Sequence, residues 1–152
     1  MTSASEAGSV TLTALAEQSS QGRGGGRDPG GESLLLICFS KSDGRELWRH
    51  QLDVGNQLHR KHNDTSPSPV TDGEHVWVAT GAGVVTALDM EGKRIWRREL
   101  QKEYGPFGMN FGYASSPLLH EGRLILQVLH GRLTDDPSYI VALDALTGKV
   151  VW

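Results

Sequence analysis

The chain has 152 residues, of which 38% are hydrophobic and 22% are charged, with a formal net charge of −3. This composition is typical of a soluble globular protein, and the charge balance gives no basic surface of the kind that nucleic-acid-binding proteins carry. No apolar run approaches the ~20 residues that a membrane-spanning helix needs. The single cysteine, Cys38, excludes an internal disulfide and is expected to be a small buried hydrophobic residue.

The N-terminal third predicts a few strands and one long loop. Residues 1–8 are small and polar, so we expect a disordered N-terminus. The alternation over 9–15 predicts a strand. The Gly-, Ser- and Arg-rich insert at 16–33 has no periodicity and predicts a flexible loop. Two further strands are expected at 34–39 and 45–52, with a Gly-containing turn between them.

The remainder of the chain predicts two sets of strands separated by long connections. Each set opens with a Ser-Pro segment, which is compatible with the start of a strand because proline removes a donor that the ladder need not use there. The predicted strands are 66–71, 75–80, 84–88, 94–100, 115–119, 123–129 and 139–143, followed by an extended run at 149–152. No segment predicts a helix, because the charged region near residue 95 belongs to a repeat whose other copies are strands.

One sequence pattern occurs three times and organises the chain. It reads ALDALTGKVVW at 142–152, ALDMEGKRIW at 87–96 and CFSKSDGRELW at 38–48. Each copy has a short β-rich run, a tight turn and an extended run that ends on tryptophan, with glycine four residues before that tryptophan. Repeats of strands with a period of about 50 residues predict a β-propeller.

We therefore predict an all-β fold made of four-stranded antiparallel blades, in the form of an incomplete β-propeller. A partial blade is expected at 9–52, a full blade at 65–100, and a blade truncated at its last strand at 113–152. Closed propellers typically have 4–8 blades. Because the chain stops on a repeat tryptophan, we expect a fragment of about two and a half blades from a longer protein.

The repeated string A-L-D-x-x-T-G-K-x-x-W and the S-P-V-x-D-G opening at 68–73 resemble the pyrroloquinoline quinone (PQQ)-like repeat. This repeat family has WD-like four-stranded blades. It is found in quinoprotein dehydrogenases, in the propeller lipoprotein of the outer-membrane β-barrel assembly machinery, and in propellers without cofactor. The resemblance covers about 34–152 and, more weakly, 9–15. It implies the propeller fold, whereas the repeated residues themselves are structural and do not distinguish between these functions.

The repeated residues are interpreted as parts of the blade framework. A tryptophan at the same place in each unit can pack its ring against the neighbouring blade, which buries a face that one unit cannot bury alone. The aspartates are expected to cap turns. The alternatives are stacking of the tryptophans on a cofactor and catalytic roles for the aspartates. The residues of this motif are Trp48, Asp89, Gly92, Trp96, Asp144, Gly148 and Trp152.

Loop lengths predict one elaborated face. In an up-and-down blade, successive turns emerge at alternate ends, and the long loops 16–33, 53–65, 101–114 and 130–138 all fall in the same set. Loops on a rigid scaffold are common places for binding and catalysis. The candidate residues on this face are His59, His62, Asn63, Asp64, Phe107, Asn110 and Tyr113.

Two interpretations of these loops stay open. The polar loop, with His59, His62 and Asp64, is either a metal site or a solvated loop, and the His spacing suits a helix better than an extended loop. The aromatic loop, with Phe107 and Tyr113 among glycines, either lines a ligand or peptide pocket or packs over the rim of the channel.

Two functions are compatible with the sequence. The first is a non-catalytic binding or assembly scaffold with a protein or peptide partner on the long-loop face. The second is a PQQ- and calcium-dependent quinoprotein dehydrogenase whose active-site residues lie in missing blades. The family resemblance implies that such enzymes carry a vicinal Cys pair, calcium ligands and an Asp base. Cys38 has no second cysteine beside it, and no position matches the ligands or the base.

We therefore predict a scaffold without catalytic, cofactor-binding or metal-binding residues in this chain, and we leave open whether the whole protein is an enzyme. The expected partners are a protein or peptide and the remaining blades of the parent propeller, not nucleic acid. The family resemblance implies a periplasmic or extracellular location, although no signal peptide is visible in this chain.

Overall fold

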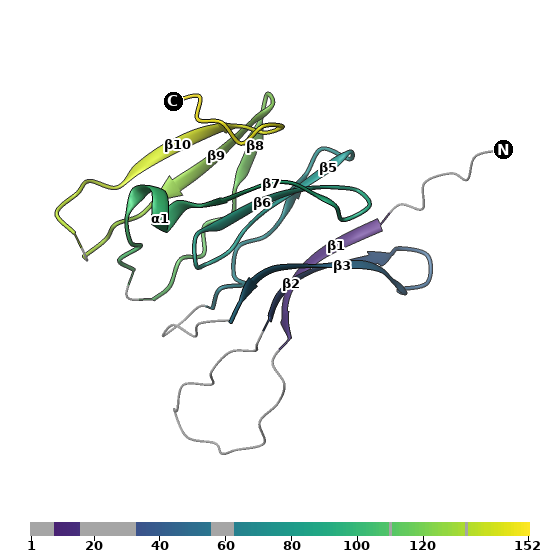
Figure 1. Cartoon of the computed structure of the whole chain (residues 1–152). Helices are drawn as coiled ribbons and strands as arrows, with labels where there is room; N and C mark the ends of the chain where they lie inside the picture. The colour runs from purple at the N-terminus through teal and green to yellow at the C-terminus, as the bar shows by residue number, and fades with distance from the viewer. Residues whose placement is uncertain (1–7, 16–32, 56–62, 110, 133) are drawn as a thin grey trace, which may run out of the picture.

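The computed structural model describes residues 8–15, 33–55, 63–109, 111–132 and 134–152, and these form three antiparallel sheets (Figure 1). The N-terminal sheet has the order β1-β2-β3, with β1 Gly8–Leu15, β2 Ser33–Ser40 and β3 Glu46–Val54. The middle sheet has the order β4-β5-β6-β7, with β4 Val70–Thr71, β5 His75–Ala79, β6 Val84–Asp89 and β7 Arg94–Glu99. The C-terminal sheet has the order β10-β9-β8, with β8 Leu118–His120, β9 Arg123–Val128 and β10 Tyr139–Asp144. The predictions for residues 1–7 and for 16–32 lie outside the described residues.

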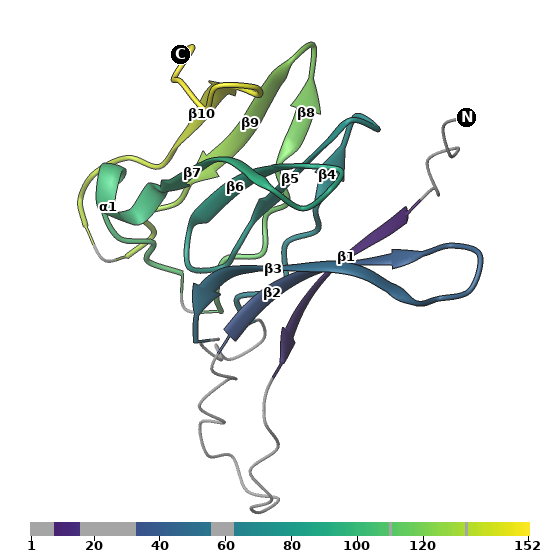
Figure 2. The ribbon, with the colours of Figure 1, turned by 45° about the vertical axis from the view of Figure 1, so that its right-hand side comes forward.

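The middle sheet packs between the other two (Figures 1 and 2). Successive side chains of a strand point to opposite faces, so the buried apolar residues of β5 and β6 supply both interfaces. One buried cluster joins the middle sheet to the N-terminal sheet through Val76, Val78 and Leu88 on one side and Leu34, Leu36 and Leu52 on the other. A second cluster joins it to the C-terminal sheet through Trp77, Val85, Ala87, Leu124, Leu126 and Leu143.

Tryptophan and glycine meet at both interfaces between sheets. A Cβ added to Gly92 would lie 2.6 Å from Cδ2 of Trp48, and one added to Gly148 would lie 2.8 Å from Cδ2 of Trp96. Each of these indoles also donates its Nε1–H to a backbone carbonyl of the same turn, at 2.8 Å in both cases. The turn at Gly44 has the same positive φ, but a Cβ there would meet nothing within 4 Å.

The turns that receive the indoles are shaped by aspartate. Asp144 accepts hydrogen bonds at Oδ1 from the backbone N–H and the hydroxyl of Thr147, at 2.8 and 2.7 Å. The bonds from Thr147 hold the pKa of the Asp144 carboxyl below its ordinary value. Asp89 stabilises the preceding turn in a similar way: its Oδ1 accepts a hydrogen bond from the backbone N–H of Lys93 at 2.8 Å. The side chain of Trp152 is more than half exposed.

The structure differs from the predicted strands at the two openings. β4 begins at Val70 and β8 begins at Leu118, three or four residues later than expected, because each follows a proline. Proline has no N–H to give to a ladder, so Pro69 and Pro117 stand just before pairing starts. The extended run at 149–152 is hydrogen-bonded to β10, through the N–H of Val151 and the carbonyl of Ala142 at 2.8 Å.

The prediction that no segment is helical was wrong. A short helix, α1 (Leu100–Tyr104), continues directly from β7, and Leu100 buries its side chain in the second core cluster. The ammonium of Lys102 in this helix pairs with the carboxylate of Glu99, the last residue of β7. Gly105, at φ 99°, ends the helix. The prediction for Cys38 is confirmed: the thiol is buried in β2, and burial raises its pKa. No described helix has the length and apolarity to cross a membrane.

Candidate binding site on the long-loop face

Parts of two long loops meet around one small cavity. The cavity has a volume of about 100 Å³, and three of the candidate residues predicted from the sequence line it: Asp64, Phe107 and Tyr113. Its other walls are Gly81, Ala82, Gln101, Met109 and Gly112. The predicted residues His59, His62 and Asn110 lie outside the described residues.

The polar loop is tied to the short turn after β5. The N–H of Gly81 donates to the carbonyl of Asp64 at 2.8 Å, and a Cβ on Gly81 would lie 2.8 Å from Cα of Asp64. The close approach therefore requires glycine at position 81. Asp64 is only 4% exposed, so this loop places a carboxylate inside the molecule, at the wall of the cavity.

Asn63 shapes the loop rather than facing the cavity. Its Oδ1 accepts hydrogen bonds from the N–H and the hydroxyl of Thr65 at 3.1 and 2.8 Å. The N–H of Asn63 donates to Oγ of Ser66 at 3.1 Å. Side-chain bonds to the backbone two residues on are the usual way in which asparagine stabilises a turn. This predicted site residue is therefore a turn former next to Asp64.

The aromatic loop is held by one glutamine. The side-chain amide of Gln101 donates to the carbonyl of Ala82 at 2.8 Å, and its Oε1 accepts the N–H of Phe107 at 2.9 Å. The rings of Phe107 and Tyr113 lie 4.8 Å apart between centroids, at 32°. Gln101 thus connects the aromatic loop to the turn after β5, to which the polar loop is also hydrogen-bonded. The sequence alone did not indicate this role.

The side chain of Tyr113, which lines the cavity, is held by a hydrogen bond to β9. Its hydroxyl donates to the carbonyl of Gln127 on β9 at 3.0 Å, and the residue is buried. Burial raises the pKa of Tyr113 to about 12, so the phenol stays neutral at physiological pH. A neutral, hydrogen-bonded phenol is suited to packing and positioning rather than to proton transfer.

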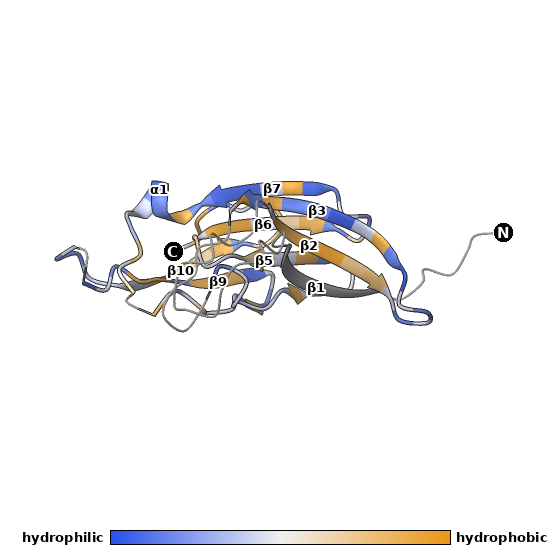
Figure 3. Ribbon diagram, turned by 90° about the horizontal axis from the view of Figure 1, so that it is seen from below, coloured by the Kyte–Doolittle hydropathy of each residue, from blue (hydrophilic) through white to orange (hydrophobic). Residues whose placement is uncertain are grey.

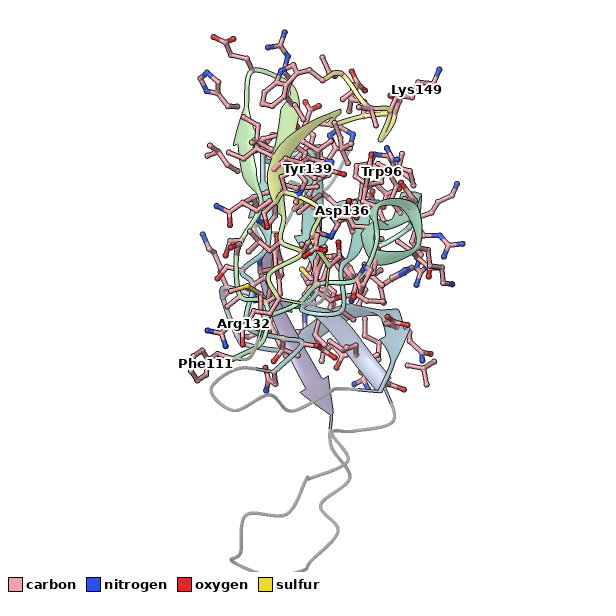
Figure 4. All side chains as sticks on the ribbon, turned by 90° about the vertical axis from the view of Figure 1, so that its left-hand side faces the viewer. Trp96, Phe111, Arg132, Asp136, Tyr139 and Lys149 are labelled. Atoms are coloured by element: carbon pink, nitrogen blue, oxygen red, sulfur yellow. The ribbon has the colours of Figure 1, made fainter. Side chains whose placement is uncertain are left out.

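The aromatic loop also pairs with the loop after β9. The N–H of Gly108 donates to the carbonyl of Leu129 at 3.1 Å, and the N–H of Arg132 donates to the carbonyl of Gly108 at 3.2 Å. A Cβ on Gly131 would lie 2.2 Å from that same carbonyl oxygen. Figure 4 shows Phe111 and Arg132 at the same end of the molecule, away from Lys149. Three long loops therefore share one end of the sheets, which we call the long-loop face.

Apolar side chains on this face are open to solvent. Met109 is 40% exposed and Phe111 is 41% exposed, although both belong to residue types that are usually buried. Met109 also lines the cavity beside Phe107. The aromatic loop therefore exposes the side chains of Met109 and Phe111 on the same face as a cavity that is lined by the Asp64 carboxylate.

The size of the cavity limits what it can hold. Sites for drug-sized ligands and cofactors measure roughly 300–1,000 Å³, whereas this cavity measures about 100 Å³. PQQ is a fused three-ring quinone, and calcium takes about 6–8 oxygen ligands. Asp64 is the one carboxylate among the described residues that line the cavity. These residues do not fit PQQ with calcium, and no group of three potential metal-binding side chains occurs in the described part of the chain.

The three stacked antiparallel sheets and the tryptophan–glycine contacts between them are typical of a repeat protein of the β-propeller class. The sequence profile of the family described as outer membrane protein assembly factor BamB matches residues 30–152. The chain belongs to this family, which confirms the predicted PQQ-like repeat and the all-β propeller fold.

Solved structures agree with this fold. The chain is similar to a quinohemoprotein alcohol dehydrogenase from Comamonas testosteroni, with 18% identity and a TM-score of 0.58 over 80% of this chain and 18% of that one. It is similar to a europium-containing methanol dehydrogenase, with 16% identity and a TM-score of 0.56 over 94% of this chain and 26% of that one. BamB from Moraxella catarrhalis gives 22% identity and a TM-score of 0.49 over 78% and 29%.

At these identities the two dehydrogenases show the fold and nothing about chemistry. The chain spans less than a third of the length of each of these three structures. No curated protein matches the sequence.

Proposed function

We propose that this chain is part of a non-catalytic propeller scaffold that binds a protein or peptide partner on its long-loop face. The observation that supports this most is the cavity of about 100 Å³ beside exposed apolar loop residues. A cavity of this size accommodates one side chain of a partner, and exposed Met and aromatic residues are enriched at protein interfaces. The description of the family as an assembly factor is consistent with this role.

The same proposal covers the organisation of the chain. Residues 9–52, 65–100 and 113–152 act as successive blades, and the repeated Trp, Gly and Asp residues join them. The remaining blades of the parent protein pack against the outer sheets. By the family resemblance, we place the protein in the periplasm or outside the cell. A PQQ-dependent dehydrogenase would need its cofactor site in other blades.

Site-directed cross-linking in the complete protein tests the proposal. A photoreactive amino acid replaces Met109 on the long-loop face, and in a matched control it replaces Glu74, which is exposed in the turn between β4 and β5. The proposal predicts one discrete cross-linked polypeptide from position 109 in the cell of origin and none from position 74. Equal labelling from both positions, or none from position 109, would contradict it.

A further inference from the structure

A charged groove runs along the outer strand of the middle sheet. It has a volume of about 580 Å³ and is lined by Arg94, Arg97, Arg98, Glu99, Lys102 and Glu103. Four of these side chains are basic and two are acidic, whereas the chain as a whole has a formal charge of −3. Figure 3 shows that β7 and α1, which carry the groove, are mostly hydrophilic in contrast to the inner strands. Positive charge is therefore concentrated locally, on the side of the molecule away from the sheet interfaces.

The basic residues of the groove differ in how far their charge is already neutralised. Arg98 is fully engaged: it binds the carboxylate of Glu103, and its Nη1 donates to the carbonyl of Gly148 at 2.7 Å. Arg97 pairs with Glu99 on its own strand and lies 3.8 Å from the carboxylate of Asp53.

The other two cations of the groove are more open to solvent. Lys102 pairs with Glu99, but its side chain is 77% exposed. The side chain of Arg94 is exposed and makes no hydrogen bond or ion pair with any described residue. The cations most open to a partner are therefore Arg94 and Lys102, whereas Arg97 can contact a partner only by sharing its ion pairs with Glu99 and Asp53.

The groove lies beside a free strand edge. In the order β4-β5-β6-β7, β7 is the last strand and pairs only with β6 among the described strands. A strand edge with unpaired N–H and C=O groups can accept an extended peptide as an additional strand. The pairing register of β7 on β6 shifts next to Arg94, so Arg94 and Arg97 oppose Leu88 and Thr86, which are two residues apart on β6. Arg94 and Arg97 therefore lie on the same face of the sheet, where alternate side chains of an added strand can reach both.

We propose that β7 binds an acidic peptide segment in extended conformation, which adds to the free edge while its carboxylates contact Arg94, Arg97 and Lys102. The molecule contains an example of this chemistry. The carboxylate of Glu103 receives a hydrogen bond from the backbone N–H of Glu99 at 3.4 Å and also binds the guanidinium of Arg98. One acidic group thus contacts both the outer backbone and a cation of β7.

Charge complementarity favours this occupant over a second copy of the same edge. Two copies of β7 laid edge to edge would bring together two strands that each carry three arginines and one glutamate, and this excess of like charge destabilises a strand pair. A neutral strand would leave the open cations without partners. The surface is on the outer strand rather than in the long-loop cavity, so the inference stands independently of the proposed function.

Fluorescence anisotropy with the 152-residue chain tests the inference. The probe is a labelled peptide of about eight residues in which glutamate alternates with threonine. We expect saturable binding that weakens as salt is raised. The Arg94→Glu variant is expected to bind at least about fivefold more weakly, because an attractive exposed pair becomes a repulsive one. The control variant Arg123→Glu makes the same charge change at the exposed first residue of β9 and should leave binding unchanged.

Two further peptides separate strand addition from charge attraction alone. A peptide methylated at alternate backbone nitrogens, with the same glutamates, should bind much more weakly because it cannot complete the ladder. A peptide with lysine in place of glutamate should not bind. Equal affinity of the methylated peptide, equal affinity of Arg94→Glu, or binding of anionic lipid vesicles without binding of the acidic peptide would each overturn the inference.

Discussion

The contact between Trp96 and Gly148 gives a stability prediction with a control in the same chain. Gly148→Ala places a methyl group where Cδ2 of the Trp96 indole lies 2.8 Å away, on a backbone with φ of +68°. The left-handed backbone costs a non-glycine residue about 1–2 kcal/mol, and forcing an extra carbon into a packed contact costs about 1–3 kcal/mol more. The expected total loss in the free energy of unfolding is about 2–5 kcal/mol.

Gly44→Ala supplies the control. Gly44 has a φ of +73°, and a Cβ there would meet nothing within 4 Å. Only the backbone cost of about 1–2 kcal/mol should remain. Urea unfolding, followed by circular dichroism and tryptophan fluorescence, measures both variants, and the midpoint of Gly148→Ala should lie below that of Gly44→Ala by about 1 M. Equal midpoints for the two variants would refute the idea that the indole contact joins the sheets.

Three other predictions concern single side chains. Trp77→Phe removes the hydrogen bond from the buried indole to the carbonyl of Ala145, at 2.7 Å, and should lower the free energy of unfolding by about 1–2 kcal/mol in urea titration; an unchanged midpoint would contradict it. Burial, followed by the charge of Arg94, lowers the pKa of His50. The folded state therefore disfavours the proton, and stability should fall as pH drops through the ordinary histidine pKa of about 6.5. His50→Gln should lose less stability between pH 7.5 and 5.5, and an identical pH dependence would count against this. Because burial raises the pKa of Tyr113 to about 12, its folded phenol resists ionisation, and stability should fall as pH rises above about 10. In an ultraviolet titration, the Tyr113→Phe variant should lack the tyrosine ionisation that occurs at the highest pH in the parent chain. Loss of an ionisation at lower pH instead would contradict the assignment.

The fold could be predicted because its signals repeat. Glycine recurs four residues before tryptophan in three copies, and each copy has turn residues at its centre. A single such string is ambiguous, but three copies indicate one strand arrangement. The short helix α1 was missed because Leu100 to Tyr104 follows a strand without a break, and a helix of five residues leaves almost no periodic pattern. Pro69 and Pro117 correctly indicated that a strand opens nearby. The predicted strands began before each proline, however, whereas pairing begins directly after it.

The site could be predicted only in part. Loop length pointed to the face, and residue type pointed to Asp64, Phe107 and Tyr113, which the fold brings to one cavity. The residues that hold these loops together were not visible in the sequence. Gln101 bridges two loops, and Gly131 allows the carbonyl of Gly108 to approach. These contacts join segments far apart in the chain, and no local pattern encodes them.

The outer arginines of β7 show a similar limit. From the sequence, Arg94 and Arg97 are ordinary charges in a repeat unit. Their importance as a surface depends on β7 being the last strand of its sheet and on α1 bringing Lys102 and Glu103 into contact with it. Sequence spacing gives neither fact.

The most direct test of the account is a titration of the complete protein with PQQ, with and without calcium, followed by tryptophan fluorescence. The tryptophans of the repeat make quenching a sensitive signal. A scaffold whose loop cavity measures about 100 Å³ predicts no saturable quenching. Saturable, calcium-dependent quenching at micromolar or lower PQQ would contradict the scaffold and make the protein a quinoprotein dehydrogenase.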